Sequence, residues 1–391
     1  MNSEGPRGVT DRRMVRLRKF STGGDVVGVC CSGAAGATDH RCGVMLTDMN
    51  PLTDSIFAHG LFLKRASLFR LGYSRRQIAS AVATGAVLRV RKGWYTVPST
   101  PLMAIEAFCI GGRLTGLSAF KTYGLWTPDT AKLHVTVPHD ARALRRPCDM
   151  NTRLGLIDRE HCAITWTDDR TARAADTPWR TSIIDALVHI LTHEGRIAAI
   201  ICLDAALNAA QHGRPGIDEH DLDTIFARAP RAVQGWRAEV DGRAGAGGET
   251  EFRLLTAAAG IPFVPQPFVD GVGYLDGQIG PHTFVEIDGK EWHDNPRARE
   301  IDTHRDAVVV RQHGTVIRVT YQMYRTHWSL TLAALLCAIE DDWKLDAPSQ
   351  FPPFPWRPKK PRKPRRERSR RHRKQPAESS KLIDEAEQAR H

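Results

Sequence analysis

The stretch that decides the fold of the N-terminal half is LGYSRRQIASAVATGAVLRVRKGWYTV, residues 71–97. Ser74 is a good helix N-cap, and Gln77 stands three residues later, as in a capping box. Apolar residues then recur at helical spacing until Gly85, which is a typical residue to follow a helix. The first part of the stretch therefore predicts a helix.

The second part of the stretch predicts a β-ribbon, because residues 86–97 alternate in polarity and turn at Lys92-Gly93. Before Gly72, apolar residues at helical spacing predict a preceding helix that this glycine ends. These residues are Leu61, Leu63, Leu68 and Leu71. Helix, turn, helix and ribbon together predict a winged helix-turn-helix over residues 56–98.

In a helix-turn-helix the second helix enters the major groove, where its exposed side chains meet bases and phosphates. The candidates on this helix are Ser74, Arg75, Arg76, Gln77 and Ser80. On the ribbon, Arg89, Arg91 and Lys92 are candidates for contacts to the DNA backbone. A solvated basic face, or a winged helix that binds protein, accounts for the same residues and remains an alternative.

Residues 104–240 predict a mixed α/β companion region. Its clearest strand covers 132–138 and its clearest helix lies near 181–192. The stretch at 71–97, together with LTGLSAFKTYGLW at 114–126 and LHVTVP at 133–138, resembles the AbiEi-type antitoxins of abortive-infection systems. The resemblance implies DNA binding and a cognate toxin protein as a partner.

Residues 242–248, GRAGAGG, predict a flexible joint, after which a separate α/β domain is expected at 246–345. In it we expect a helix at 249–259, strands at about 263–269, 272–279 and 282–288, a helix at about 296–313 and a strand at 316–320. A turn at Gly280-Pro281 should form a hairpin that brings Asp276 toward Glu286 and Asp288. Since Glu286 and Asp288 are two residues apart on one strand, they share a face.

Three convergent carboxylates repel one another unless a hard cation lies among them, which predicts a Mg²⁺ or Mn²⁺ site. Such an ion polarises a scissile phosphate and lowers the pKa of a bound water. His293 is a candidate general base and Lys290 a candidate cation within a few residues of the cluster. An ordinary polar strand face is the structural alternative.

The segments GETEFRLLTAAAGIP, GYLDGQIG, FVEIDGKEWH, DTHRD and VIRVT, in this order between residues 248 and 320, resemble a domain allied to very-short-patch-repair endonucleases of the PD-(D/E)xK superfamily. The resemblance implies a restriction-endonuclease-like α/β fold with a small mixed sheet. It makes Asp276 the central metal ligand, Glu286 the next acidic ligand and Glu249 the helix-borne acid. The Ile287 carbonyl would face the metal. Asp288 departs from the superfamily pattern, because it replaces the lysine of ExK, and Lys290 lies two residues late.

Other polar residues of this domain are expected to have structural roles. Asp302, Arg305 and Asp306 should form an ion-pairing scaffold, and Arg318 is a candidate for reaching a phosphate. Three histidines are expected to be solvated: His282, His304 and His313.

The charge of the chain is concentrated near its C-terminus. Residues 357–374 hold 12 Lys or Arg against one Glu, and the remaining 43 basic and 43 acidic residues balance. The segments 1–50 and 346–391 are expected to be a disordered leader and a disordered basic tail that attaches to nucleic acid without sequence preference. The eight cysteines form no CxxC pair and no apolar run is long enough for a membrane span, which predicts a cytoplasmic protein without a membrane partner.

The sequence thus favours a DNA-binding protein with a metal-dependent endonuclease domain that hydrolyses DNA phosphodiesters in phage defence or DNA repair. The main alternative is a non-catalytic AbiEi-like antitoxin or transcriptional regulator. A third alternative is an interaction protein whose winged helix binds protein.

Overall fold

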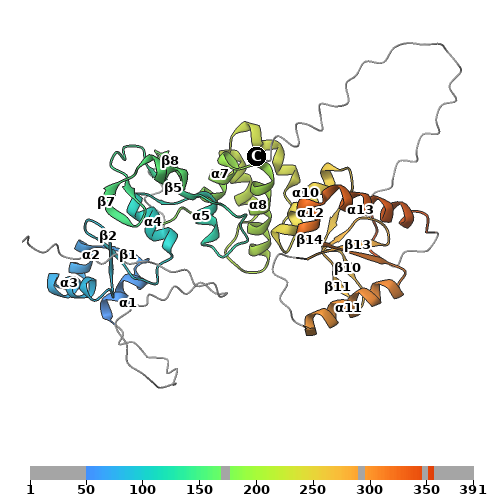
Figure 1. Ribbon diagram of the computed structural model, residues 1–391, viewed down its shortest axis with the longest axis horizontal. Coiled ribbons are helices and arrows are strands. Elements are labelled where there is room, and N and C mark those ends of the chain that lie inside the picture. Colours follow the sequence, from blue (N-terminus) through green and yellow to red (C-terminus); the bar gives the residue numbers. More distant parts are fainter. Residues whose placement is uncertain (1–49, 169–176, 289–295, 346–350, 356–391) are drawn as a thin grey trace, which may run out of the picture.

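The computed structural model describes residues 50–168, 177–288, 296–345 and 351–355, and these form a mixed α/β structure with several small sheets. In Figure 1 the first and last described segments, blue and orange, lie toward opposite ends of the long axis, and the segment between them runs from above the blue part to the centre of the molecule. We refer to these three segments as the N-terminal unit (residues 50–98), the middle region (99–240) and the C-terminal unit (241–355).

The N-terminal unit consists of three helices and a three-stranded antiparallel sheet with the order β1-β3-β2. Its elements are α1 (Pro51–Ala58), β1 (Phe62–Lys64), α2 (Arg65–Arg70), α3 (Arg75–Ala83), β2 (Leu88–Arg91) and β3 (Trp94–Thr96). The predicted capping box is present, because the Ser74 side chain accepts from the Gln77 N–H while the Gln77 side chain accepts from the Ser74 N–H. The predicted hairpin turn is present as well, with Gly93 at φ 77°.

The predicted helix before residue 72 is wrong in its first half. Leu63 lies in β1, and Leu61 has a φ of 73°, which no helix accommodates. Only residues 65–70 are helical. Both leucine side chains still pack inward, Leu63 in the core of the N-terminal unit and Leu61 against a cluster that also includes residues of the middle region.

The middle region combines a small sheet with a group of helices. Its elements are α4 (Leu102–Ile110), β4 (Arg113–Leu114), α5 (Gly116–Lys121), β5 (Leu133–Pro138), β6 (Arg145–Arg146), β7 (Asp149–Arg153), α6 (Leu156–Glu160), β8 (Cys162–Thr167), α7 (Ile183–His193), α8 (Arg196–Gln211), α9 (Glu219–Arg228) and a 3₁₀ helix (Arg231–Glu239). The sheet has the order β4-β5-β8, with β5 and β8 parallel. The strand and the helix predicted for this region are β5 and α7.

The N-terminal unit and the middle region share a hydrophobic core. Phe62 of β1 stacks on Phe108 of α4 with ring centroids 4.3 Å apart, and Val90 of β2 belongs to the same buried cluster. The boundary near residue 98 is therefore a packed contact.

The C-terminal unit places a four-stranded sheet among helices. Its elements are α10 (Gly247–Ala258), β9 (Val264–Pro265), β10 (Phe268–Val269), β11 (Gly273–Tyr274), β12 (Gly277–Gln278), β13 (Thr283–Asp288), α11 (Pro296–Arg311), β14 (Thr315–Thr320), α12 (Tyr321–Thr326) and α13 (Trp328–Asp342). The sheet order is β14-β13-β12-β9, with β13 and β14 parallel and the other pairs antiparallel. The hairpin predicted at Gly280-Pro281 connects β12 to β13. The two strands predicted before it are each broken into two short strands.

The glycine-rich segment 242–248 is not the flexible joint that its composition predicts. A Cβ on Gly247 would lie 2.1 Å from the Trp126 ring, and a Cβ on Gly242 would lie 2.5 Å from Leu207 Cβ. These glycines therefore allow close packing between the middle region and the C-terminal unit. Buried Asp204 of α8 strengthens the connection, because it accepts hydrogen bonds from Thr250 and Arg253 of α10.

No helix among the described residues is long and apolar enough to cross a membrane.

Candidate functional site

The hairpin between β12 and β13 positions Asp276 beside Glu286. Gly277 pairs with Val285, so Asp276 and Glu286 are neighbours across the two strands. The Ile287 N–H donates to Asp276 Oδ2 at 2.7 Å, which fixes this carboxyl group against β13. Burial raises the pKa of Asp276, while hydrogen bonds from Ile287 and with Glu286 oppose the shift.

Glu249 approaches Asp276 from the first turn of α10. Its side chain is buried, and its Oε2 accepts from the Gly245 N–H at 2.9 Å and from Gln266 Nε2 at 2.8 Å. Burial, and then the nearby charge of Asp276, raise the pKa of Glu249 to about 7. The predicted helix acid therefore belongs to the same cluster as the two strand carboxyls.

Gln266 is a member of this cluster that the sequence did not reveal. Its backbone N–H donates to the Asp276 carbonyl at 3.2 Å while its side chain holds Glu249. Its φ of 53° lies in the left-handed region, which glutamine rarely adopts. Local strain at a residue that bridges two acidic positions is typical of functional sites, but no pattern in the sequence marks it.

Glu286 is the third carboxyl group of this cluster. Burial, followed by repulsion from Asp276, raises the pKa of Glu286 to about 8, and Arg305 lowers it from 3.7 Å away. The pKa values of Glu249, Asp276 and Glu286 are thus all raised, chiefly by burial. We call these three residues the carboxyl cluster.

Asp288 lies on β13 next to this cluster, but its charge is compensated. Arg318 Nη1 is 3.4 Å from Asp288 Oδ1, and the same guanidinium pairs with Asp306 at 3.0 Å and Asp302 at 3.9 Å. The predicted ion-pairing scaffold of Asp302, Arg305 and Asp306 is therefore present. Arg318, predicted to reach a phosphate, pairs with three carboxylates in this structure.

Two predicted residues, Lys290 and His293, lie outside the described residues. Within the described part of the chain, no three His, Cys, Asp or Glu side chains are arranged as they stand to hold a metal ion. The donor chemistry nevertheless suits a hard divalent cation, because the carboxyl cluster supplies several oxygens whose mutual repulsion a cation would relieve. Of the predicted ligands, Asp276 and Glu286 are neighbours across the β12–β13 hairpin, and Ile287 follows Glu286 on β13.

The histidine predictions are partly wrong. His282 is only 5% exposed, and its Nδ1 lies 2.7 Å from Asp342 Oδ1. Asp342 also accepts from Thr283 Oγ1, so this histidine belongs to a buried structural network. His304 and His313 are exposed, as predicted.

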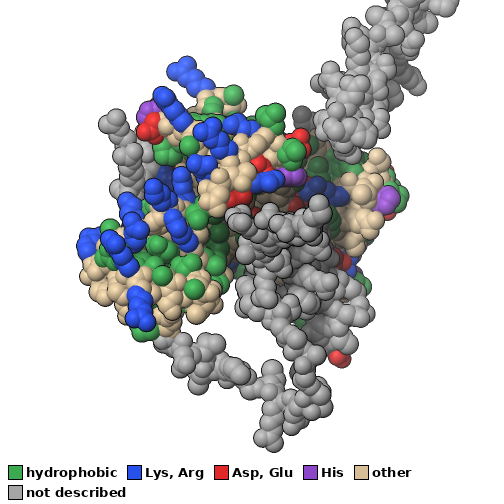
Figure 2. Space-filling view, turned by 60° about the vertical axis from the view of Figure 1, so that its left-hand side comes forward, with side chains coloured by type: hydrophobic (Ala, Val, Ile, Leu, Met, Phe, Trp, Pro, Cys, Tyr) green, Lys and Arg blue, Asp and Glu red, His purple; other side chains and the backbone are tan. Residues whose placement is uncertain are grey.

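A second candidate site lies on the N-terminal unit, where most of the predicted DNA-binding residues are exposed. Arg75 and Arg76 extend from the first turn of α3, and Arg89 and Lys92 lie on the ribbon. Figure 2 shows Lys and Arg side chains gathered over this unit and the adjoining middle region. Gln77 is exposed too, but its Oε1 accepts from Ser74 in the capping box, so it is not free for a bidentate contact to adenine.

Arg91 does not belong to the exposed set. Its Nη1 would lie 2.5 Å from a Cβ on Gly111, so its guanidinium is directed against the end of α4. Arg91 is half-buried, and this burial lowers the pKa of its guanidinium. Strict alternation would place Arg89 and Arg91 on one face, but the register of β2 against β3 shifts between them, and Arg91 is directed toward the middle region instead.

Arg65 joins the exposed set instead. A groove of about 410 Å³ runs between α3 and the ribbon, and Arg65, Arg75 and Arg89 line it from three different elements. Its floor is apolar and includes Ile78 and Val82. The pattern missed Arg65 because the residue was placed inside a longer helix.

Neither a protein-family model nor a curated protein matches this chain.

Proposed function

We propose that the protein binds DNA through the N-terminal unit and hydrolyses a DNA phosphodiester bond at the carboxyl cluster with Mg²⁺ or Mn²⁺. The observation that carries this proposal is the crowding of Glu249, Asp276 and Glu286, whose pKa values are all raised. Perturbed carboxyls on separate elements, held together at a stability cost, are typical of functional sites.

The metal would be held by Asp276, Glu286 and the Ile287 carbonyl. When bound, it supplies Lewis-acid polarisation of the phosphate and activation of water. Asp276 is held in place by the Ile287 N–H, and Glu249 is oriented by Gln266 and Gly245. Arg305 places a positive charge 3.7 Å from Glu286, where it stabilises the ionised form of that carboxyl.

Two roles in the proposal rest on sequence alone. His293 is the candidate general base and Lys290 the candidate cation near the scissile phosphate. Asp288 is assigned to the scaffold around Arg318. The resemblance to very-short-patch-repair endonucleases supports the same reaction class.

DNA binding is proposed for the groove-lining arginines and the exposed ribbon. Arg65, Arg75 and Arg89 converge on one groove, and none of them forms an ion pair with a described residue. Uncompensated arginines gathered on one face favour the phosphate backbone as their partner. Arg76, beside the groove, is the candidate for base contacts.

A non-catalytic regulator of the AbiEi type is the second candidate. The arginine groove favours this candidate, because DNA binding by its arginines needs no residue of the carboxyl cluster. In that case the protein would bind operator DNA and a cognate toxin, and the carboxyl cluster would serve only structure.

The test is a nicking and cleavage assay on supercoiled plasmid with and without Mg²⁺ or Mn²⁺. We expect metal-dependent cleavage by the wild type and loss of cleavage in Asp276→Asn and Glu286→Gln. Asp270→Asn, an exposed acidic residue on the neighbouring turn, is the control and should cleave normally. DNA binding without cleavage by the wild type would favour the regulator.

A further inference from the structure

Two histidines of the middle region direct buried ring nitrogens at the same space. A Cβ on Gly116, the first residue of α5, would lie 2.7 Å from His189 Nδ1 of α7 and 3.1 Å from His134 Nδ1 of β5. Neither nitrogen forms a hydrogen bond with a described residue. Because buried polar atoms are nearly always paired, two unpaired nitrogens directed at one space indicate a ligand.

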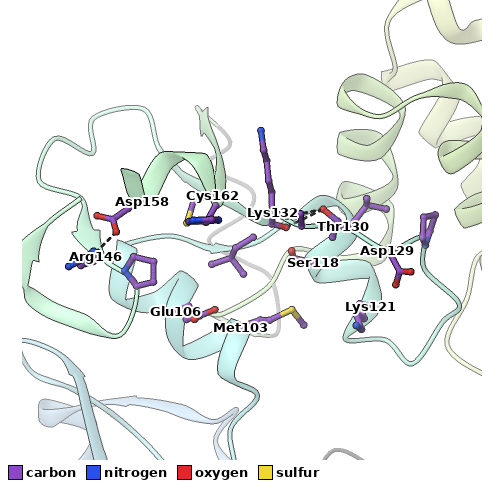
Figure 3. A pocket seen from close by; sticks show the side chains of 16 residues that line it. Met103, Glu106, Ser118, Lys121, Asp129, Thr130, Lys132, Arg146, Asp158 and Cys162 are labelled. Atoms are coloured by element: carbon purple, nitrogen blue, oxygen red, sulfur yellow. Dashed lines mark hydrogen bonds and ion pairs between the residues drawn. The ribbon is translucent and has the colours of Figure 1, made fainter. Parts of the chain in front are cut away.

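The other nitrogen of each ring is held by a threonine hydroxyl. His189 Nε2 lies 2.9 Å from Thr165 Oγ1 of β8, and His134 Nε2 lies 3.2 Å from Thr130 Oγ1. In Figure 3, Thr130 lies beside Lys132 on the loop that leads into β5. When Nε2–H donates to such a hydroxyl, Nδ1 keeps a free lone pair, and metal-binding histidines are usually oriented in this way.

A carboxylate and a third imidazole ring lie at the end of α7. Glu194 Oε1 is 3.5 Å from His134 Nδ1. His193 follows His189 by one helical turn, and the centroids of the two rings are 4.3 Å apart. Histidines at positions i and i+4 of a helix share one face, a spacing that occurs in zinc sites. Several nitrogen ligands and one oxygen ligand therefore gather between β5 and α7.

The two buried rings are in the protonation state that binds metal. Burial lowers the pKa of His189 to about 3 and also lowers the pKa of His134, so both rings are neutral at pH 7. As they stand, the described side chains do not enclose an ion. His193 is exposed and the Glu194 side chain is 22% exposed, so these two can change rotamer to complete a site while the buried rings stay in place.

We propose that a divalent transition metal of the zinc type binds here, with His134, His189 and Glu194 as its ligands. His193 is the fourth ligand. Imidazole nitrogens together with a carboxylate oxygen are typical ligands of Zn²⁺, whereas Mg²⁺ and Mn²⁺ prefer oxygen ligands. The ion would tie β5 to the end of α7 and so stabilise the middle region. The site shares no residue with the carboxyl cluster and is independent of DNA cleavage.

The test is calorimetric titration of the full chain with Zn²⁺ in excess Mg²⁺, which competes for sites made of oxygen ligands. We expect Zn²⁺ to bind and to raise the melting temperature. His134→Gln and His189→Gln should each weaken Zn²⁺ binding at least tenfold. Thr165→Val should weaken it about tenfold, because it removes the hydroxyl that orients the His189 ring. His220→Gln, which changes an exposed histidine of α9, is the matched control and should bind like the wild type.

Three outcomes would overturn the proposal. One is the absence of Zn²⁺ binding by the wild type, and another is equal binding by the wild type and all three variants of the site. The third is loss of binding in Asp276→Asn but not in the histidine variants, which would place Zn²⁺ at the carboxyl cluster. If the buried change His134→Gln prevents folding, as judged by circular dichroism, the variants at half-buried His189 and Thr165 decide the test. Plasmid cleavage, measured on the same preparations, reports separately on the carboxyl cluster.

Discussion

Two adjacent glycines at the start of α10 should respond to the same substitution to different extents. A Cβ on Gly247 would lie 2.1 to 2.4 Å from three atoms of the Trp126 ring. A Cβ on Gly248 would lie 3.2 Å from the Tyr324 hydroxyl and 3.9 Å from Ile287. Neither glycine has a positive φ, so alanine suits the backbone at both positions.

Gly247→Ala should therefore destabilise the protein by about 1 to 3 kcal/mol, the usual cost of overpacking, because the Trp126 ring must leave its site. Gly248→Ala should cost less than Gly247→Ala, because only the Tyr324 hydroxyl, 3.2 Å from the added Cβ, must shift, and because alanine restricts the unfolded chain more than glycine by about 0.4 to 1 kcal/mol. Urea unfolding followed by tryptophan fluorescence measures both free energies. Equal stability of the two variants would refute the conclusion that residues 242–248 are a packed contact, and would restore the flexible joint.

Three further predictions concern charge. Arg65→Gln and Arg75→Gln should each reduce the slope of log K against log salt for DNA binding by about 0.9. Arg70 lies outside the groove and contacts Ser67, so Arg70→Gln should leave the slope unchanged. Equal slopes in all three variants would exclude the groove as the DNA-binding site. Truncation after Phe354 should also flatten the slope, because it removes the basic tail, and an unchanged slope would leave the tail without a role in binding. Because burial and Asp276 raise the pKa of Glu286 to about 8 from an ordinary 4.5, the folded metal-free protein binds a proton that the unfolded chain has released. Its free energy of unfolding should therefore fall as the pH rises from 4.5 to about 8. Urea titrations over this pH range should show a smaller fall for Glu286→Gln. An identical pH profile of stability in the variant would contradict the raised pKa.

Local chemistry explains which parts of the fold were predictable. The N-cap Ser74, the turn at Gly93 and the hairpin at Gly280-Pro281 are specified by neighbours in sequence, and the structure has all three. Leu61 and Leu63 were assigned to a helix because an apolar residue at every second position fits both a strand and part of a helix. Leu63 pairs with Tyr95 of β3, and the Leu61 carbonyl accepts from Thr96 Oγ1; both partners are too far along the chain for a local pattern to reveal.

The candidate site was predictable in its acidic residues and not in its surroundings. Asp276 and Glu286 could be predicted as neighbours because a hairpin places them together. Gln266 could not, because it reaches the cluster through a strained backbone conformation and a contact with Glu249 of α10. The glycines at 242–248 led to a prediction of a flexible joint, but glycine occurs both where the chain is flexible and where two segments pack closely. The partners of Arg91 and His282 are likewise tertiary contacts that no spacing rule reveals.

The most direct test of the carboxyl cluster is calorimetric titration of the protein with Mn²⁺ at pH 7 in buffers of different ionisation enthalpy. Because the pKa of Glu286 is about 8 and that of Glu249 about 7, metal binding must displace protons from the cluster. We predict that the wild type binds Mn²⁺ with release of protons to the buffer, and that Asp276→Asn loses this binding. Absence of Mn²⁺ binding by the wild type, or binding that releases no protons and survives in Asp276→Asn, would contradict the metal site.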